Sequence, residues 1–116
     1  MAFQISTKEK GGTLVVSLSG SLDTLFAEDL KTDFGQILRT GKKHIVLDLK
    51  GVKYVASGAI RAILYLGKSL QQNQGALRVA QVDPKVLEVF KMVGLGSALP
   101  IFDSLSEALD GFGEPE

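Results

Sequence analysis

The stretch His44-Ile-Val-Leu-Asp-Leu-Lys-Gly-Val-Lys-Tyr-Val-Ala-Ser-Gly58 decides the fold of this chain. Residues 44–49 form an almost unbroken apolar run, which is typical of a strand buried on both faces of a mainly parallel sheet. After this run, apolar residues recur at helical spacing from Ile60 to about Gln74, so a helix follows the strand. Ser57 is the residue type that favours the N-cap position of this helix.

The same alternation of strands and helices extends outward on both sides of this stretch. The expected elements before it are strands over 3–8 and 13–19, joined by Gly11-Gly12, and a helix over 24–40 capped by Asp23 or Thr24. The expected elements after it are a strand over 76–82, a helix over 84–93 capped by Asp83, a strand over 99–102 and a helix over 104–109 with a capping box at Ser104. This order predicts right-handed crossovers between parallel strands.

A chain of 116 residues is long enough for one domain and too short for two. We therefore expect a single α/β domain over residues 1–110, with a mixed sheet, parallel central strands and about four helices. The glycine-rich residues 111–116 are expected to form a disordered tail.

The composition excludes several functional classes. The chain has no cysteine and one histidine, which argues against disulfides, thiolate nucleophiles and zinc sites, and we expect no cofactor. Its 13 basic and 13 acidic side chains balance, so neither nucleic acid nor a membrane surface is an expected partner. The chain shows no bilayer-spanning segment and no secretion signal, which predicts a cytoplasmic protein without membrane insertion.

Motifs for nucleotide binding and nucleophilic catalysis fail on spacing and position. The segment from Gly35 to Lys43 has five residues between its glycines where a phosphate-binding loop has four, and it falls at a helix C-terminus. His44 begins the buried strand and Ser57 follows its end, so the two are expected at opposite ends of the sheet. Asp48, inside the strand, is expected to accept hydrogen bonds from loop N–H groups.

Two loops at the carboxyl ends of expected parallel strands are the best candidates for function, because sites in such sheets gather there. They are Gly20–Asp23 and Tyr54–Gly58. Ser57 either caps its helix or accepts a phosphoryl group, whose charge the helix N-terminus tolerates. Arg61, four residues on, is either an ordinary solvated residue or able to reach back to that phosphate.

Taken together, Gly20-Ser-Leu-Asp23, the stretch 44–58 and Ala59-Ile-Arg-Ala-Ile-Leu64 resemble the STAS domain of bacterial anti-sigma factor antagonists. The resemblance covers about residues 3–109. It implies that Ser57 is the phosphoacceptor of a serine kinase that is also the anti-sigma factor. The sequence departs from the family pattern at Ala56, where Asp or Ser is usual, and at Gly58-Ala59.

The resemblance implies a non-enzymatic regulator that sequesters an anti-sigma factor and is switched off by phosphorylation of Ser57. The implied partner-binding residues are Ser21, Asp23, Tyr54, Ala56, Gly58 and Arg61. A serine phosphatase is a further candidate partner, and the oligomeric state stays open between a monomer and a weak homodimer. The alternatives are a STAS scaffold in a stress-signalling or transporter-associated complex, with Ser57 only a cap, and a small nucleotide-binding enzyme.

Overall fold

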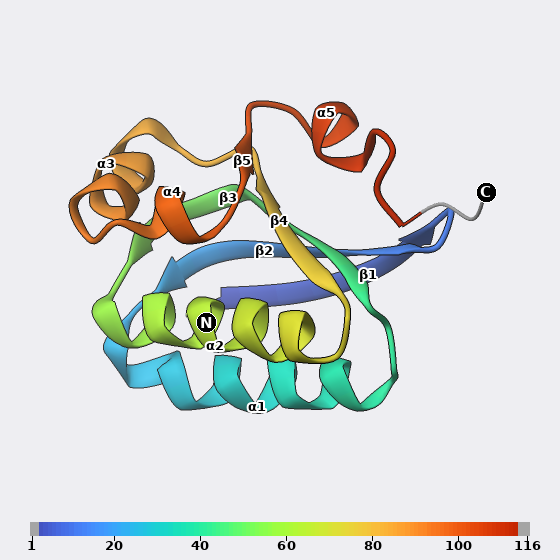
Figure 1. Cartoon of the computed structure of the whole chain (residues 1–116). Coiled ribbons are helices and arrows are strands. Elements are labelled where there is room, and N and C mark those ends of the chain that lie inside the picture. The colour runs from blue at the N-terminus through green and yellow to red at the C-terminus, as the bar shows by residue number, and fades with distance from the viewer. Residues whose placement is uncertain (1–2, 114–116) are drawn as a thin grey trace.

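The chain forms five strands, five α-helices and one short 3-10 helix within residues 3–113, which the computed structural model describes (Figure 1). In chain order these are β1 (Phe3–Lys10), β2 (Thr13–Leu22), η1 (Thr24–Phe26), α1 (Ala27–Arg39), β3 (His44–Val55), α2 (Ser57–Gln72), β4 (Ala76–Ala80), α3 (Pro84–Met92), α4 (Leu95–Ala98), β5 (Ile101–Phe102) and α5 (Leu105–Leu109). The predicted single α/β fold is confirmed.

The strands form one mixed sheet in the order β1-β2-β3-β4-β5. β1 pairs antiparallel with β2, and the other neighbouring pairs are parallel, as the sequence predicted. Gly11 and Gly12 join β1 to β2 with φ values of 49° and 82°. Two consecutive positive φ values suit a tight hairpin turn, which explains why both positions are glycine.

β3 is longer than the sequence predicted and ends at Val55 instead of Leu49. Its register with β2 shifts beside Ser19, which pairs with Gly51. A Cβ on residue 51 would lie 2.6 Å from the Cβ of Ser19, so only glycine fits this irregularity without a backbone shift. β3 continues beyond this shift, and its last residue, Val55, pairs with Leu22 at the end of β2.

The main core lies between the sheet and the layer formed by α1 and α2, which run side by side beneath it in Figure 1. Phe34 of α1 and Phe90 of α3 are among its largest fully buried side chains. A Cβ on Gly67 of α2 would lie 2.8 Å from Leu99 and 3.5 Å from Leu77 of β4. α2 and β4 therefore approach closely at Gly67.

A smaller core on the opposite face lies beneath α5. Its buried members are Val15, Val46, Ala80, Ala108 and Phe112. Phe112 is 6% exposed, and the Thr13 hydroxyl donates a hydrogen bond of 2.6 Å to its carbonyl oxygen. The predicted boundary at residue 110 is therefore too early, because Phe112 packs against residues far away in the sequence. The rest of the predicted tail, 114–116, lies outside the described residues.

The helix ends agree with the sequence where the signals are local. Asp83 and Ser104 each accept a hydrogen bond from a backbone N–H within their own first turn, as predicted. Asp23 occupies the N-cap position of η1 but makes no capping hydrogen bond. The short helix α4 was not predicted; it follows Gly94, whose φ of 75° reverses the chain. The described residues therefore contain five α-helices, where about four were expected.

Candidate functional site

Ser57 is exposed and is the first residue of α2, not its N-cap. The N-cap is Ala56, which has extended backbone angles, φ −87° and ψ 165°, and no side-chain cap. The predicted capping role of Ser57 is therefore wrong. The cause is that the Ala56 N–H donates to the carbonyl oxygen of Leu22 at 2.8 Å, which keeps residue 56 in the extended conformation of the strand. The Ser57 hydroxyl has no capping function and faces solvent.

The two candidate loops lie side by side at the carboxyl ends of β2 and β3. Ser21 pairs with Tyr54 and Leu22 pairs with Val55, directly before the helix that begins at Ser57. Asp23 follows Leu22 and is therefore part of the same surface. The structure thus brings together residues that are more than 30 positions apart in the sequence, as expected for neighbouring parallel strands.

Asp23 carries an unsatisfied polar atom at this surface. Its side chain is half-buried, and its Oδ1 is buried without a hydrogen-bond partner among the described residues. A buried oxygen without a donor costs about 1–3 kcal/mol, more when it is charged. A donor on a bound partner would relieve this cost.

Gly58 and Arg61 place the start of α2 against the start of α1. A Cβ on Gly58 would lie 3.0 Å from the Cβ of Ala27, so the two helices approach closely here. Arg61 is exposed one turn after Ser57 and lines a groove of about 410 Å³ between α1 and α2. This groove was not predicted from the sequence. The small residues Ala27, Gly58 and Ala62 were the available signal, but their contact depends on tertiary packing.

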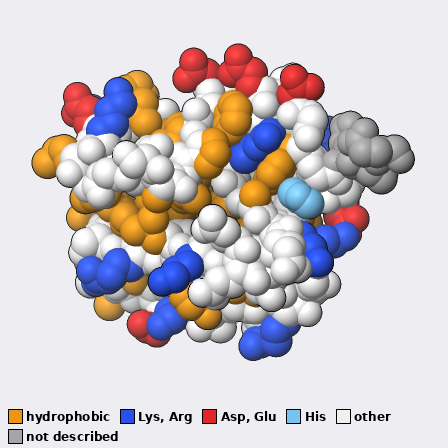
Figure 2. Space-filling model, in the orientation of Figure 1, with side chains coloured by type: hydrophobic (Ala, Val, Ile, Leu, Met, Phe, Trp, Pro, Cys, Tyr) orange, Lys and Arg blue, Asp and Glu red, His pale blue; other side chains and the backbone are white. Residues whose placement is uncertain are grey.

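Several large apolar side chains are exposed, and Figure 2 shows apolar atoms gathered between α2 and the pair of helices α3 and α4. Tyr54 is 55% exposed, Leu25 of η1 81% and Met92 of α3 84%. Val93, the C-cap residue of α3, is also 55% exposed. Leu25 and Met92 were missed by the sequence analysis, since single exposed apolar residues leave no periodic signal.

The charged side chains near this surface differ in whether they have an ion-pair partner. Lys53 Nζ lies 3.5 Å from Asp83 Oδ2, so its charge has a partner. The Lys85 backbone N–H donates to Asp83 and, with Lys53, lowers the pKa of that carboxyl. Arg61 and Lys31, by contrast, form no ion pair with any described residue.

The residues considered for catalysis lie elsewhere. His44 begins β3 and Ser57 follows its end, which confirms that they occupy opposite ends of the sheet. Asp48 is 9% exposed and accepts hydrogen bonds from the Lys50 N–H at 3.1 Å and from Gln81 Nε2 at 2.9 Å. Its carboxylate therefore has hydrogen-bond donors. They are a backbone N–H of its own strand and the Gln81 side chain, whereas loop N–H groups were expected.

Residues 3–113 contain neither a membrane-spanning helix nor a metal-binding cluster. No helix there is both long and apolar enough to cross a bilayer. The same residues contain no cluster of three or more acidic or histidine side chains that could hold a metal ion.

Comparison with known proteins shows what the chain is similar to. Residues 4–108 match the STAS domain family. An anti-sigma F factor antagonist of Paenibacillus polymyxa is 34% identical over 110 residues, which cover 94% of each chain.

Solved structures below 25% identity share the fold. An anti-sigma factor antagonist from Mycobacterium paratuberculosis has a TM-score of 0.87 at 22% identity, covering 95% of this chain and 93% of that one. The Bacillus cell fate determinant SpoIIAA in its phosphorylated form has a TM-score of 0.71 at 22% identity, with 95% and 98% covered. A sulfate transporter family protein from Wolinella succinogenes has a TM-score of 0.76 at 18% identity, with 90% and 87% covered.

The match over residues 4–108, together with a relative 34% identical along nearly the whole chain, establishes that this protein belongs to the STAS domain family.

Proposed function

We propose that this chain is a non-enzymatic anti-sigma factor antagonist that sequesters an anti-sigma factor with serine kinase activity. The observation that carries the proposal is the exposed Ser57 hydroxyl, which lies at the first turn of α2 and has no capping function. The proposed contact surface comprises Ser21, Asp23, Tyr54, Ala56, Gly58 and Arg61. The relative described as an anti-sigma F factor antagonist supports this role.

Phosphorylation of Ser57 is the proposed off-switch. A phosphate adds about −2 charge at neutral pH, and the free N–H groups of a helix N-terminus favour such a charge. The domain should therefore stay folded when modified. The partner, however, would have to desolvate the phosphate on binding, and each 1.4 kcal/mol lost lowers affinity about tenfold. A fold neighbour solved in a phosphorylated form agrees with this chemistry. A serine phosphatase would restore the active state.

The test is phosphorylation by a purified anti-sigma factor kinase from the same organism, with ATP and readout by mass spectrometry. The wild type is expected to gain one phosphate, and Ser57→Ala none. Ser106→Ala is the matched control, since Ser106 is an exposed serine of α5 outside the proposed contact surface and should leave the phosphate in place. Equal phosphorylation of the wild type and Ser57→Ala would overturn the switch.

The second candidate is a STAS scaffold that is not phosphorylated, and the fold neighbour from a sulfate transporter family favours keeping it. Ser57→Asp distinguishes the two functions. The switch predicts that this variant loses affinity for the anti-sigma factor, whereas the scaffold predicts unchanged partner binding. A cytoplasmic location, and a monomer or weak homodimer, stay predictions.

A further inference from the structure

The groove between α1 and α2 begins at the proposed contact surface. Gly58, the neighbour of Ser57, lines it together with Ala27 and Ala62, and these are small residues at which the two helices approach closely. Tyr65, half exposed, also lines the groove. The groove has a volume of about 410 Å³, so a partner seated over Ser57 can place a side chain into it.

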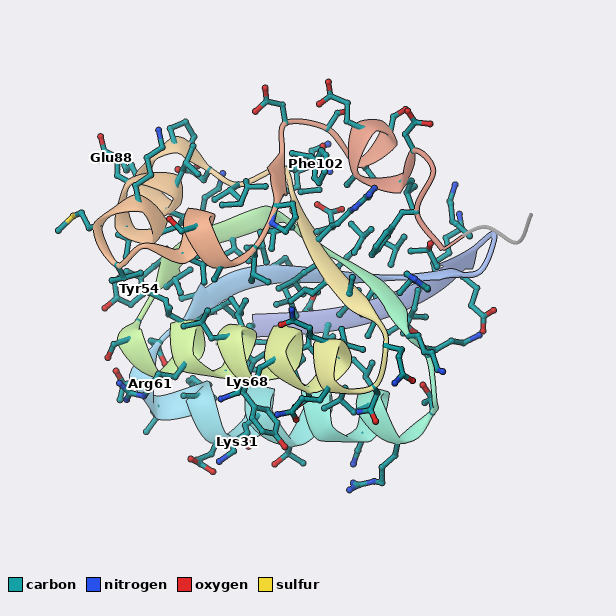
Figure 3. The ribbon with its side chains drawn as sticks, viewed as in Figure 1. Lys31, Tyr54, Arg61, Lys68, Glu88 and Phe102 are labelled. Atoms are coloured by element: carbon teal, nitrogen blue, oxygen red, sulfur yellow. The ribbon has the colours of Figure 1, made fainter. Side chains whose placement is uncertain are left out.

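The groove carries two cations that lack an acidic partner. Arg61 from α2 and Lys31 from α1 line it, both are exposed, and neither forms an ion pair within the described part of the chain. Glu28 is the one acidic residue that lines the groove. Figure 3 shows Arg61 and Lys31 coming from the two helices on the same side of the molecule. Figure 2 shows Lys and Arg atoms gathered over this layer, with several acidic side chains along the opposite rim near α5.

We propose that the groove receives a carboxylate side chain of the anti-sigma factor, which Arg61 and Lys31 bind from opposite helices. The inference rests on the proposed function and adds a specific partner chemistry to it. A guanidinium and an ammonium that lack internal partners are complementary to an Asp or Glu. The charged residues of the lining are Arg61, Lys31 and Glu28, so the lining has a net positive charge. This charge disfavours binding of a basic segment of the partner.

The same geometry links the groove to the switch. Arg61 follows Ser57 by four residues, so both lie on one face of α2, and helical side chains lean toward the N-terminus. A phosphate on Ser57 would therefore compete with the partner's carboxylate for the Arg61 guanidinium. Phosphorylation then weakens binding by removing an attraction as well as by adding charge.

Binding measurements test the charge requirement. The anti-sigma factor is titrated into the wild type, Arg61→Glu, Lys31→Glu and the control Lys43→Glu, and circular dichroism verifies that each variant is folded. Lys43 is an exposed lysine at the other end of the sheet, just before β3. We expect both groove variants to bind about tenfold or more weakly and the control to bind within about twofold. Groove variants that bind like the control overturn the inference alone, whereas a wild type that does not bind overturns the proposed function and the inference with it.

Zero-length cross-linking tests which group enters the groove. A carbodiimide joins a carboxylate to a lysine amine, so the complex is expected to give a link from Lys31 to an Asp or Glu of the anti-sigma factor. Arginine does not react in this way, and Arg61→Lys should therefore add a second link, from residue 61 to the same partner peptide. A complex that binds but gives neither link contradicts the inference.

Discussion

The amino and carboxyl ends of the parallel strands differ in whether their side chains have partners within the chain. At the amino ends, which we call the closed end, Thr13, His44 and Arg78 pack around Phe112 from the C-terminal segment. At the carboxyl ends, the open end, Asp23, Tyr54 and Ser57 face solvent or lack partners. The C-terminal segment covers the amino ends of the sheet, whereas exposed side chains at the carboxyl ends are available to a partner.

The closed end is held by several different interactions. The His44 ring meets Phe112 edge to face at 5.1 Å, and the Arg78 guanidinium lies 4.1 Å from the centre of the Phe112 ring. Arg78 Nη1 also donates to the carbonyl oxygens of Ala108 and Asp110 at 2.9 and 3.1 Å. The Thr13 hydroxyl and the Arg78 guanidinium thus bind groups within the chain, so this end contributes stability and offers little to a partner.

The largest effect is expected from opening the closed end. Phe112→Ala should lower the free energy of unfolding by about 3 kcal/mol, because it leaves a cavity beneath α5 and removes the stacking surface of Arg78. Urea unfolding measures the change. Leu25→Ala is the control, since Leu25 is 81% exposed and its loss should change stability by less than about 0.5 kcal/mol. Similar losses for both variants would show that the C-terminal segment does not hold the closed end.

A smaller loss of stability is expected from a substitution at Gly51, where β3 continues toward the open end. Gly51→Ala should destabilise by about 1–3 kcal/mol, because its Cβ would meet Ser19 at 2.6 Å and the backbone must shift. Gly35→Ala in α1 is the matched control: nothing lies within 4 Å of its added Cβ, so it should gain about 0.5–1 kcal/mol. Thermal unfolding of both variants tests the comparison, which fails if the two changes have the same sign.

The open end should respond in binding rather than in stability. Tyr54 is 55% exposed, so Tyr54→Ala should leave the unfolding free energy within about 0.5 kcal/mol of the wild type. Its affinity for the anti-sigma factor should fall about tenfold, because exposed aromatic residues often dominate protein interfaces. Calorimetric titration measures the affinity. A Tyr54→Ala variant that binds with the affinity of the wild type would show that Tyr54 is not part of the proposed contact surface.

The smallest effect separates two serines at helix starts. Ser104 accepts a hydrogen bond from the Glu107 N–H at 3.1 Å, so Ser104→Ala should cost about 1 kcal/mol. Ser57 caps nothing, and Ser57→Ala should change stability by less than about 0.5 kcal/mol. Denaturant unfolding compares them. An equal cost at both positions would mean that Ser57 caps α2 after all.

Local patterns predicted most of the elements correctly. The apolar run after His44, the helical spacing after Ser57 and the Gly11-Gly12 turn each depend on residues that are neighbours in the chain. The caps at Asp83 and Ser104 were predicted for the same reason, since each hydrogen bond closes within one helical turn. The candidate surface was also predicted in outline, because the carboxyl ends of parallel strands must lie at one edge of the sheet.

Two of the failures involve contacts between distant residues. The N-cap of α2 moved from Ser57 to Ala56 because a hydrogen bond to Leu22 extends the strand. Phe112, which falls in the expected tail, belongs to the core because Thr13 and Arg78 contact its carbonyl oxygen and its ring. No periodicity within either segment carries these contacts.

The sequence by itself determined the order of strands and helices, the parallel sheet and the position of Ser57 at its carboxyl edge, because hydrophobic period and turn chemistry act locally. Only the tertiary structure decided that Ser57 is free of capping, that the closed end is covered by Phe112, and that Arg61 and Lys31 share a groove. Each of these depends on which side chains meet across the sheet and between helices, and that is set by packing in three dimensions.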